Sequence, residues 1–414
     1  MIKTRVPVPL LVFILSFSLG GVAEGQSPLT LQECIDIALE QNPLILAAAE
    51  YHRATLARIP QARALPQPTI GYDSDLQPGF FDFSGSLESY LGITFELPFP
   101  TKLSAQGNIA GKDSDLFLAD TDMLKLDTVF RVKEAFYGVL LAEARLEYAE
   151  DDLQHAEDFA EMTELKFAAG EVAEVEALRS RVSASGAMNR IRTATNDVRV
   201  ARALLNFALG RRNGASLEVE GDLQIPLIVS ELAELKDLAY ALRPETRANE
   251  LAMEREEIAK SLARQSYVPD LEMGISRHRI HSVPTTWDVT FGVTVPLFFW
   301  QPKRGQIAEA IANLSALAQE REHVKNSISL EVEQAYRDAV TARDQIELFE
   351  TDILRQAEEV HNMFLFSYQE GEIGGLELIT ARVTLLLARS TYADALYGYA
   401  VTMAALQRAT GQGI

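Results

Sequence analysis

Hydrophobic positions along the chain follow two different periods. Over most of its length, apolar residues recur every three to four positions, as at Val129, Val132 and Phe136, which is typical of a helix with one packed seam. Two shorter stretches, at about 67–98 and about 269–297, alternate apolar with polar residues instead, and this period predicts a β-hairpin in each. We therefore expect a mostly helical chain with a small amount of strand.

Two similar stretches interrupt the long helical patterns and predict the tips of helical hairpins. Each contains glycine, glutamate and a β-branched residue in that order: Gly170-Glu171-Val172 and Gly371-Glu372-Ile373. Glycine ends a helix at little cost because it reaches the left-handed conformation without a Cβ penalty. A helix end followed at once by a new helical period is the pattern of an αα-hairpin. We expect one tip near residue 170, after a long helix over about 111–167, and another near residue 371.

The order of these elements occurs twice, which indicates a tandem duplication. Chance similarity between helices rarely keeps one register through helices, strands and tips alike. We therefore assign residues 24–214 to a first repeat, 215–232 to a linker or equatorial segment, and 233–414 to a second repeat. Residues that recur about 200 positions apart include Ala38 and Ala241, Pro66 and Pro269, Gly92 and Gly292, Val132 and Val332, and Gly210 and Gly411.

Residues 1–23 are typical of a secretory signal peptide. Lys3 and Arg5 precede an apolar run from Val8 to Leu19, and small residues follow it. That run is shorter than the ~20 apolar residues of a transmembrane helix, and no other run in the sequence approaches this length. The mature protein is therefore expected to be exported. If it lies in a membrane, its strands must close into a barrel, because lipid offers no partner to an open sheet edge.

Composition and motifs restrict the function further. The formal net charge of −21 argues against nucleic acid as a partner, because its phosphates need a basic face. Cys34 is the only cysteine, which excludes a disulfide framework and predicts a buried helical thiol. His278 and His281 are expected on the loop after a strand, where no third ligand is near enough to predict a metal site. Because nucleophile and zinc motifs are missing from the sequence, we predict no catalytic residue, no enzyme activity and no cofactor.

The number of strands predicts an assembly of several chains. Two hairpins give four strands per chain, whereas the smallest outer-membrane barrels need about eight. The clearer strands are about ten residues long, which is the length that crosses a bilayer when tilted. Several chains would therefore share one barrel, with their helices projecting from one side as a tube of roughly 80–100 Å.

Three motifs resemble those of the TolC-like outer-membrane efflux proteins. They are the tip pattern Tyr368-x-x-Gly371-Glu-Ile-x-x-Leu-Glu377, the helix start Ala38-Leu-x-x-Asn-Pro43, and the strand exit Pro296-Leu-Phe298. The resemblance covers essentially the whole mature chain, from Leu29 to Gly411. It implies a mostly α fold with some β structure: a homotrimer whose chains together form a twelve-stranded outer-membrane β-barrel, continued by a periplasmic α-helical barrel.

The same resemblance implies a passive function. The trimer would be the outer-membrane channel of a tripartite efflux or secretion system in a Gram-negative bacterium, surrounded by outer-membrane lipid, with its helices in the periplasm. Its implied partners are a periplasmic adaptor protein and an inner-membrane transporter, for which the RND type is one candidate. The exported substrate is not readable from this chain, because selection lies mainly with the inner-membrane partner.

Members of this family close their tunnel with acidic rings near the second hairpin tip. Glu377 matches one such position, Thr380 stands where a second acid is often found, and Glu176 is the repeat partner of Glu377. The resemblance therefore implies a periplasmic gate at Glu176 and Glu377, where crowded carboxylates would respond to cations and to pH. The alternative for both residues is an ordinary solvated helix face. Turning the tips and docking the adaptor are carried over to Gly170, Glu171, Val172, Gly371, Glu372 and Ile373.

A soluble periplasmic coiled-coil adaptor or scaffold protein is the alternative interpretation of the whole chain. The hairpins, the acidity and the signal peptide would all fit such a protein. The strands distinguish the two, because an adaptor does not need two copies of a strand pair with one apolar face. Aromatic residues end these strands where a membrane girdle would lie, namely Phe99 and Phe298-Phe299-Trp300.

Overall fold

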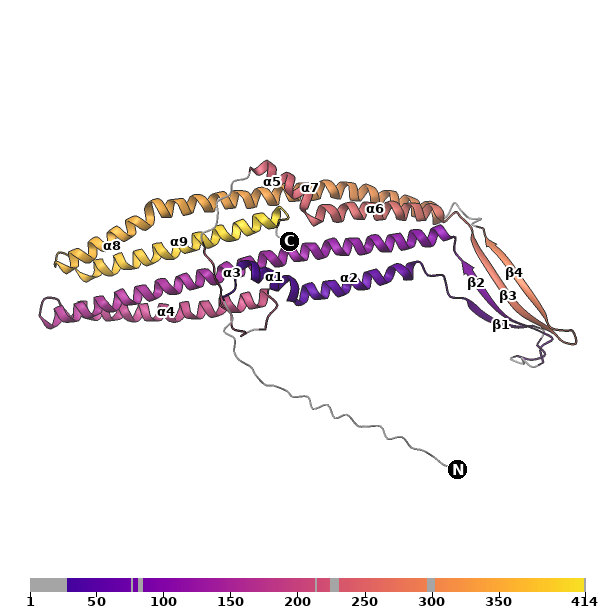
Figure 1. Cartoon of the computed structure of the whole chain (residues 1–414), viewed down its shortest axis with the longest axis horizontal. Helices are drawn as coiled ribbons and strands as arrows, with labels where there is room; N and C mark the ends of the chain where they lie inside the picture. The colour runs from indigo at the N-terminus through magenta and orange to yellow at the C-terminus, as the bar shows by residue number, and fades with distance from the viewer. Residues whose placement is uncertain are drawn as a thin grey trace, which may run out of the picture.

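Figure 1 shows the chain as a long bundle of helices that carries a small sheet at one end. This computed structural model describes residues 28–75, 77–80, 85–212, 214–223, 231–295 and 302–412. The predicted signal peptide, part of the predicted linker and the aromatic residues Phe298-Phe299-Trp300 lie outside these ranges.

Each half of the chain has two short helices, then two strands, then a long helical hairpin. The first half contains α1 (Leu31–Gln41), α2 (Pro43–Ala62), β1 (Thr69–Asp75), β2 (Glu88–Leu97), α3 (Pro100–Ala168) and α4 (Glu174–Ala208). The second half contains α5 (Leu232–Leu242), α6 (Pro244–Gln265), β3 (Asp270–Ile280), β4 (Thr286–Thr294), α7 (Pro302–Leu348), the π-helical turn η1 (Phe349–Ile353), α8 (Leu354–Gln369) and α9 (Gly375–Ala409). Within the described ranges, no helix combines the length and the apolar character that a membrane span requires.

Side-chain caps explain how the first helices begin. The Thr30 N–H donates to Glu33 Oε2 at 2.8 Å and the Glu33 N–H donates to Thr30 Oγ1 at 3.4 Å, which is a capping box. Asn42 ends α1 and begins α2, because its Oδ1 accepts the Leu44 N–H at 2.9 Å. Pro43 occupies the first position of α2, where its missing N–H costs nothing.

The long helix α3 starts earlier than the expected range of about 111–167. It begins at Pro100, because proline is well suited to a first helical position, and it runs for 69 residues. Lys102 anchors this start by donating to Asp270 Oδ1 at 2.8 Å. Gly107 is tolerated inside the helix because Arg63 packs over it, so that an added Cβ would lie 2.1 Å from Arg63 Nε.

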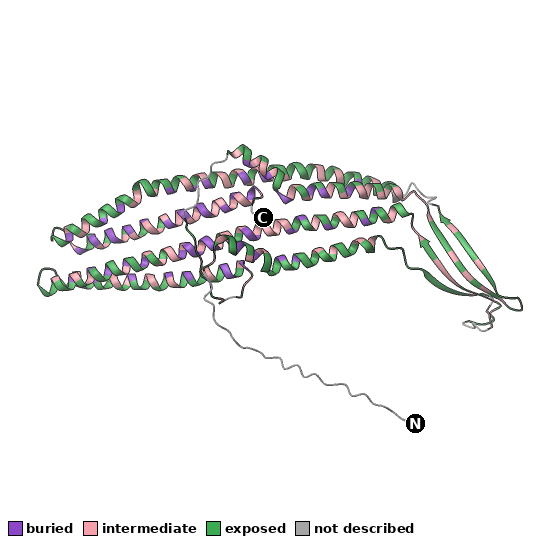
Figure 2. Ribbon diagram, viewed as in Figure 1, coloured by how far each residue is buried: buried purple, intermediate pink, exposed green. Residues whose placement is uncertain are grey.

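The four strands form one antiparallel sheet in the order β1-β2-β3-β4, so β2 and β3 join the two halves of the chain. The register places apolar residues beside one another across the sheet, with Ile70 opposite Ile93, Ile93 opposite Ile275, and Ile275 opposite Val289. This apolar face is exposed in the single chain, and Figure 2 colours the strands as exposed or intermediate. The strands β1 and β4 are the two open edges of the sheet.

The largest group of buried side chains lies near the middle of the bundle, where α1 and the ends of α4 and α9 pack on α3. The predicted seam on α3 is confirmed, because Val129, Val132 and Phe136 are all buried there. Cys34 is also fully buried, and burial raises the pKa of its thiol to about 11. The prediction of a buried helical thiol is therefore confirmed.

The glycines that end α4 and α9 make the same contact in the two halves. Gly210 has φ +75° and lies so close to Asn42 that an added Cβ would be 2.7 Å from its Cα. Gly411 has φ +74°, and an added Cβ there would be 3.0 Å from the carbonyl carbon of Leu242. Glycine meets both the positive φ and the close approach, so each hairpin base packs on the junction of its own two short helices.

Candidate functional site

The two hairpin tips have the same backbone geometry. Gly170 has φ +77° and Gly371 has φ +79°, which confirms that both glycines end their helices in the left-handed conformation. In each tip the N–H after the glycine donates back to a helix carbonyl at 2.9 Å: Glu171 to Lys166 O and Glu372 to Ser367 O. These bonds satisfy carbonyls that have no partner within the helix, so each tip is a defined turn rather than an open loop.

Tyr368 links the second tip to the first hairpin. Its ring is buried and lies 5.1 Å from the Phe159 ring of α3, and its hydroxyl lies 3.2 Å from Thr163 Oγ1. Lys166 Nζ donates to Tyr368 O at 3.0 Å and sits 4.7 Å from the centre of the Tyr368 ring. A cation at the carbonyl end of α8 stabilises that helix end. Burial raises the pKa of Tyr368, so its hydroxyl keeps its proton.

Glu176 and Glu377 come together beside Gly374. A Cβ added to Gly374 would lie 3.1 Å from Glu377 Oε2 and 3.6 Å from Glu176 Oε1. The two carboxylates therefore converge on one point although they belong to different hairpins, and the missing side chain at residue 374 leaves them room. Thr380, at the position of the second family acid, donates its hydroxyl to Leu376 O at 2.9 Å and is tied to its own helix.

The remaining tip residues differ in exposure. Glu171 and Glu372 are exposed, whereas Val172 is half-buried and Ile373 packs on the cluster around Tyr368. The two acids are thus the accessible part of this set, and Ile373 contributes to the packing of the tip itself.

Farther from the tips, a charged cluster that sequence reasoning missed joins α3, α4 and α9. The Asp152 side chain is 2% exposed and the Arg382 side chain 5% exposed. Arg190 Nη2 lies 2.5 Å from Asp152 Oδ2, and Arg382 Nη1 donates to Asp152 O at 2.8 Å. Arg382 Nη2 also donates to Ser183 Oγ at 2.6 Å, so one arginine of α9 holds both helices of the first hairpin.

One sequence signal could have found Asp152. It falls on the packed face of α3, at helical spacing from buried residues on both sides: Ala149, Ala156, Phe159 and Thr163. A carboxylate at such a seam position needs a buried partner. The sequence did not identify Arg382 as this partner. Arg181 occupies the equivalent position in the first repeat, yet its side chain is 57% exposed.

Two imidazoles lie in the same interface. His155 of α3 and His361 of α8 have ring centres 5.7 Å apart, and His361 is buried. Both rings line a cavity of about 280 Å³ together with Asp158, Gln369 and Arg382. Burial lowers the pKa of His361, and the neighbouring His155 lowers it further, so His361 is neutral at neutral pH.

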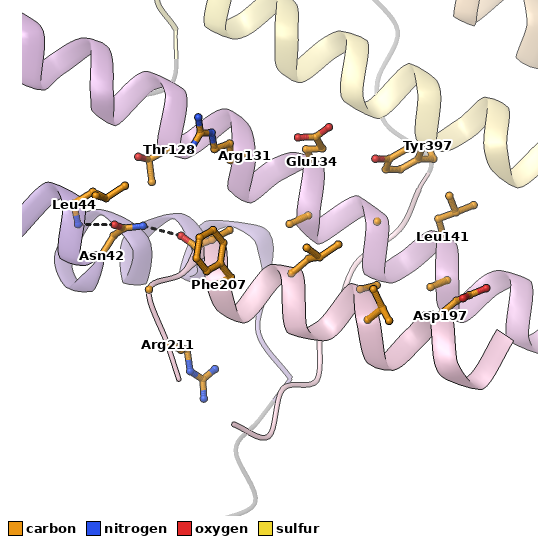
Figure 3. Close-up of a pocket in the computed structure, with 18 of the residues that line it drawn as sticks. Asn42, Leu44, Thr128, Arg131, Glu134, Leu141, Asp197, Phe207, Arg211 and Tyr397 are labelled. Atoms are coloured by element: carbon orange, nitrogen blue, oxygen red, sulfur yellow. Dashed lines mark hydrogen bonds between the residues drawn. The ribbon is translucent and has the colours of Figure 1, made fainter. Parts of the chain in front are cut away.

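A larger groove of about 870 Å³ lies on the side of the bundle, between α2, α3 and α4 (Figure 3). Leu44, Leu141 and Phe207 give it an apolar wall, and Arg131 and Glu134 also line it. Phe207 is 73% exposed in the single chain. An open apolar groove of this size is typical of a surface that is covered by a partner.

The expectation for the histidines near the sheet is wrong for His278. It lies within β3, where its ring stacks on Tyr90 at 4.1 Å and Nδ1 lies 3.4 Å from Asp288 Oδ2. The strand continues through Ile280 because Ile280 still pairs with Glu88 of β2. Over the part of the chain that the structure describes, no group of three or more His, Cys, Asp or Glu residues could hold a metal ion.

Comparison with known proteins matches the two halves of the chain to the same family model. The family model described as outer membrane efflux protein matches residues 34–211 and again residues 235–412. The cobalt-zinc-cadmium resistance protein CzcC of Cupriavidus metallidurans is 26% identical over 371 residues, which cover 89% of this chain and 87% of CzcC.

Solved structures of outer-membrane channels share the fold. The CusC channel superposes with a TM-score of 0.76 at 18% identity, over 92% of both chains. VceC of Vibrio cholerae gives 0.74 at 16% identity, over 92% of this chain and 96% of VceC. The open state of MtrE of Neisseria gonorrhoeae gives 0.74 at 19% identity, over 92% and 89%. The chain is thus similar to TolC-like channel subunits along nearly its whole length.

Proposed function

The chain belongs to the outer membrane efflux protein family, and we propose that three copies form one exit duct with a periplasmic gate at Glu176 and Glu377. The protein is an outer-membrane channel of the kind that serves tripartite efflux systems, with its helices in the periplasm. The family consists of channels rather than enzymes, and the adaptor interpretation is not favoured.

The sheet supports the proposed trimer. A four-stranded sheet with open edges at β1 and β4 leaves backbone groups unpaired, which lipid does not tolerate. Joining β1 of one copy to β4 of the next would close a twelve-stranded barrel and remove every edge. The exposed apolar face of the sheet would then meet the lipid, and the polar face would line the duct.

The outer helices of the bundle support a head-to-tail ring. Because α3 packs between α4 and α9, and α8 packs on α9, α4 and α8 lie at opposite edges of the bundle. Both edges expose large apolar side chains, including Phe207 on α4 and Phe366 on α8. Opposite charges on the two edges favour placing α4 of one copy against α8 of the next, which would also cover the groove of Figure 3. The α4 edge carries Arg179, Arg181, Arg192, Arg199 and Arg202 beside one acid, Asp197, and the η1–α8 edge carries Glu350, Asp352, Glu358 and Glu359 beside one arginine, Arg355.

The tips support the proposed gate. Each chain brings Glu176 and Glu377 to one point beside Gly374, so threefold symmetry would place a ring of carboxylates at the narrow end of the tube. Such a ring attracts cations and repels itself when it is fully ionised. The contacts of Tyr368 and Lys166 between the hairpins would hold the ring in place.

The partners follow from the family. We propose that a periplasmic adaptor docks on the tips around Gly170, Glu171, Val172, Gly371, Glu372 and Ile373. An inner-membrane transporter, for which the RND type remains one candidate, would supply the substrate. Metal cations are the cargo class to test first, because CzcC is named for resistance to cobalt, zinc and cadmium. A strain without this channel should then become sensitive to these metals and not to organic drugs.

The gate is tested by removing its charge. The double variant Glu176→Ala with Glu377→Ala should raise the single-channel conductance of the trimer in planar bilayers severalfold and weaken its preference for cations, because the proposed constriction loses its carboxylates. A matched control removes the same number of acids from the tips, in Glu171→Ala with Glu372→Ala. That control should keep the conductance of the unsubstituted trimer and lose adaptor binding instead. Unchanged conductance and selectivity in the first variant would exclude these residues as the constriction.

A further inference from the structure

The ion pair between Asp152 and Arg382 joins the two hairpins, but its hydrogen bonding is incomplete. Arg382 Nη1 lies 3.2 Å from Asp152 Oδ1, a contact without hydrogen-bond geometry. Among the described residues, neither this oxygen nor Arg382 Nε has a hydrogen-bond partner. Buried charges that are incompletely paired are costly, so a modest change in the local charge is enough to weaken the contact.

His361 places a titratable group near this contact. It lines the same cavity as Arg382, and its ring centre lies 5.7 Å from that of His155 across the boundary between the two hairpins. Phe159 and Leu378 line the same cavity, and apolar surroundings of this kind favour the neutral imidazole. A protonated imidazole would instead bring a second buried cation next to the Arg382 guanidinium.

The charged groups around His361 leave little to compensate such a proton. From α9, Arg382 and Arg389 lie nearby, and Arg389 is 3.6 Å from Asp151 of α3 and 3.0 Å from Glu358 of α8. Asp152 of α3 already meets Arg190 of α4 as well as Arg382. The remaining acid in the cavity wall is Asp158, which accepts a hydrogen bond from Gln154 at 2.9 Å. Asp151, Asp152 and Glu358 are thus already paired with arginines, and Asp158 is exposed to solvent.

The helix that carries His361 has a place to bend. The outer helix of the second hairpin is interrupted by the π-helical turn η1, whereas α3 continues for 69 residues. Figure 1 shows that this long helix changes direction between α7 and α8. Short π-helical turns are frequent at functional sites and at sharp kinks of helices, and His361 lies about two helical turns beyond this one.

We propose that His155, His361 and Arg382 form a proton-operated latch that holds α8 and α9 against α3 at neutral pH and releases them at η1 when the periplasm becomes acidic. The inference rests on the proposed function in one respect, since it states when the gate would open. The latch itself is a contact within a single chain, so it can be measured without recording channel conductance.

The direction of the pH effect follows from the form that the closed interface prefers. Burial holds the pKa of His361 below its value in an open, hydrated state, which is about 6.5. The stability of the closed contact is therefore fully present above that pH and is lost as pH falls through it toward the lower pKa of the closed form.

The test measures the distance between the hairpins directly. Spin labels are placed at Leu165→Cys on α3 and Glu370→Cys after α8, both exposed positions, in a Cys34→Ala background diluted with unlabelled chains. Between about pH 7.5 and pH 5.5, the distance should shift to longer values with a midpoint below about 6.5. The variant His361→Phe should stay closed at both pH values. A matched control, His323→Phe at an exposed position of α7, should keep the full shift.

Several outcomes separate the latch from the gate. If His361→Phe does not assemble, His361→Gln carries the same expectation. The latch is overturned if the distance between the labels does not change with pH in the protein that has His361. It is also overturned if His361→Phe and His361→Gln show the same shift as that protein. A pH-dependent distance with pH-independent conductance supports the latch and contradicts the gate. A constant distance, with conductance that still depends on Glu176 and Glu377, supports the gate and overturns the latch.

Discussion

The two helical hairpins share one backbone plan and differ in how their side chains are used. Both tips turn on a glycine with positive φ, and both return through a helix of 35 residues. The first long helix of the first hairpin, α3, is unbroken, whereas η1 interrupts the corresponding helix of the second hairpin between α7 and α8. The equivalent arginines also differ, because Arg181 is exposed beside Glu164 and Arg382 is buried against Asp152.

This difference indicates that the two repeats have taken on different structural roles since the duplication. The first hairpin supplies the uninterrupted helix α3 and the groups that accept hydrogen bonds from Arg382. The second supplies the arginine that reaches across, a buried histidine and a π-helical turn. In the proposed latch, the place to bend lies in the second repeat, and the contact that can be released joins the two repeats.

The largest expected effect contrasts the two repeat-related arginines. Arg382→Met leaves the buried Asp152 with Arg190 as its remaining partner, and should lower the free energy of unfolding by about 3 kcal/mol. Arg181→Met removes an exposed ion pair with Glu164 and should change it by less than about 0.5 kcal/mol. Urea unfolding in detergent measures both. Equal losses would contradict the asymmetry between the hairpins.

An intermediate effect is expected at the start of α9. An added Cβ at Gly375 would lie 2.8 Å from Phe159 Cζ, so Gly375→Ala should cost about 2 kcal/mol by overpacking the tip cluster. The equivalent residue of the first repeat, Glu174, is exposed, and Glu174→Ala should cost less than about 0.5 kcal/mol through its lost interaction with the helix N-terminus. Thermal unfolding of the two variants gives the ratio, and a neutral Gly375→Ala would mean that Phe159 moves aside freely.

The smallest difference is expected at the turns themselves. Gly170→Ala and Gly371→Ala each force a side chain into the left-handed conformation, with open space around the added Cβ. Each should therefore lower the free energy of unfolding by a similar amount, about 1 kcal/mol. A much larger loss at one of them, in the same unfolding assay, would show that the two tips are not equivalent.

Local signals predicted the parts of the site that depend on local conformation. The glycines of the tips and the alternating strands are confirmed, because each depends on residues within a few positions along the chain. The contact between Asp152 and Arg382 depends instead on residues 230 positions apart. No local pattern distinguished Arg382 from Arg181, so the buried cluster could not be predicted.

By itself, the amino-acid sequence determined the kind and the order of the elements, because helical and strand periods, caps and turns are written in neighbouring residues. It also indicated the family, because the motifs of the tips and strand ends are short and local. The tertiary structure alone decided which charges are buried and which acids converge beside Gly374. The physical reason is that burial and charge pairing arise when distant helices pack, and two helices with the same local sequence pattern then meet different neighbours.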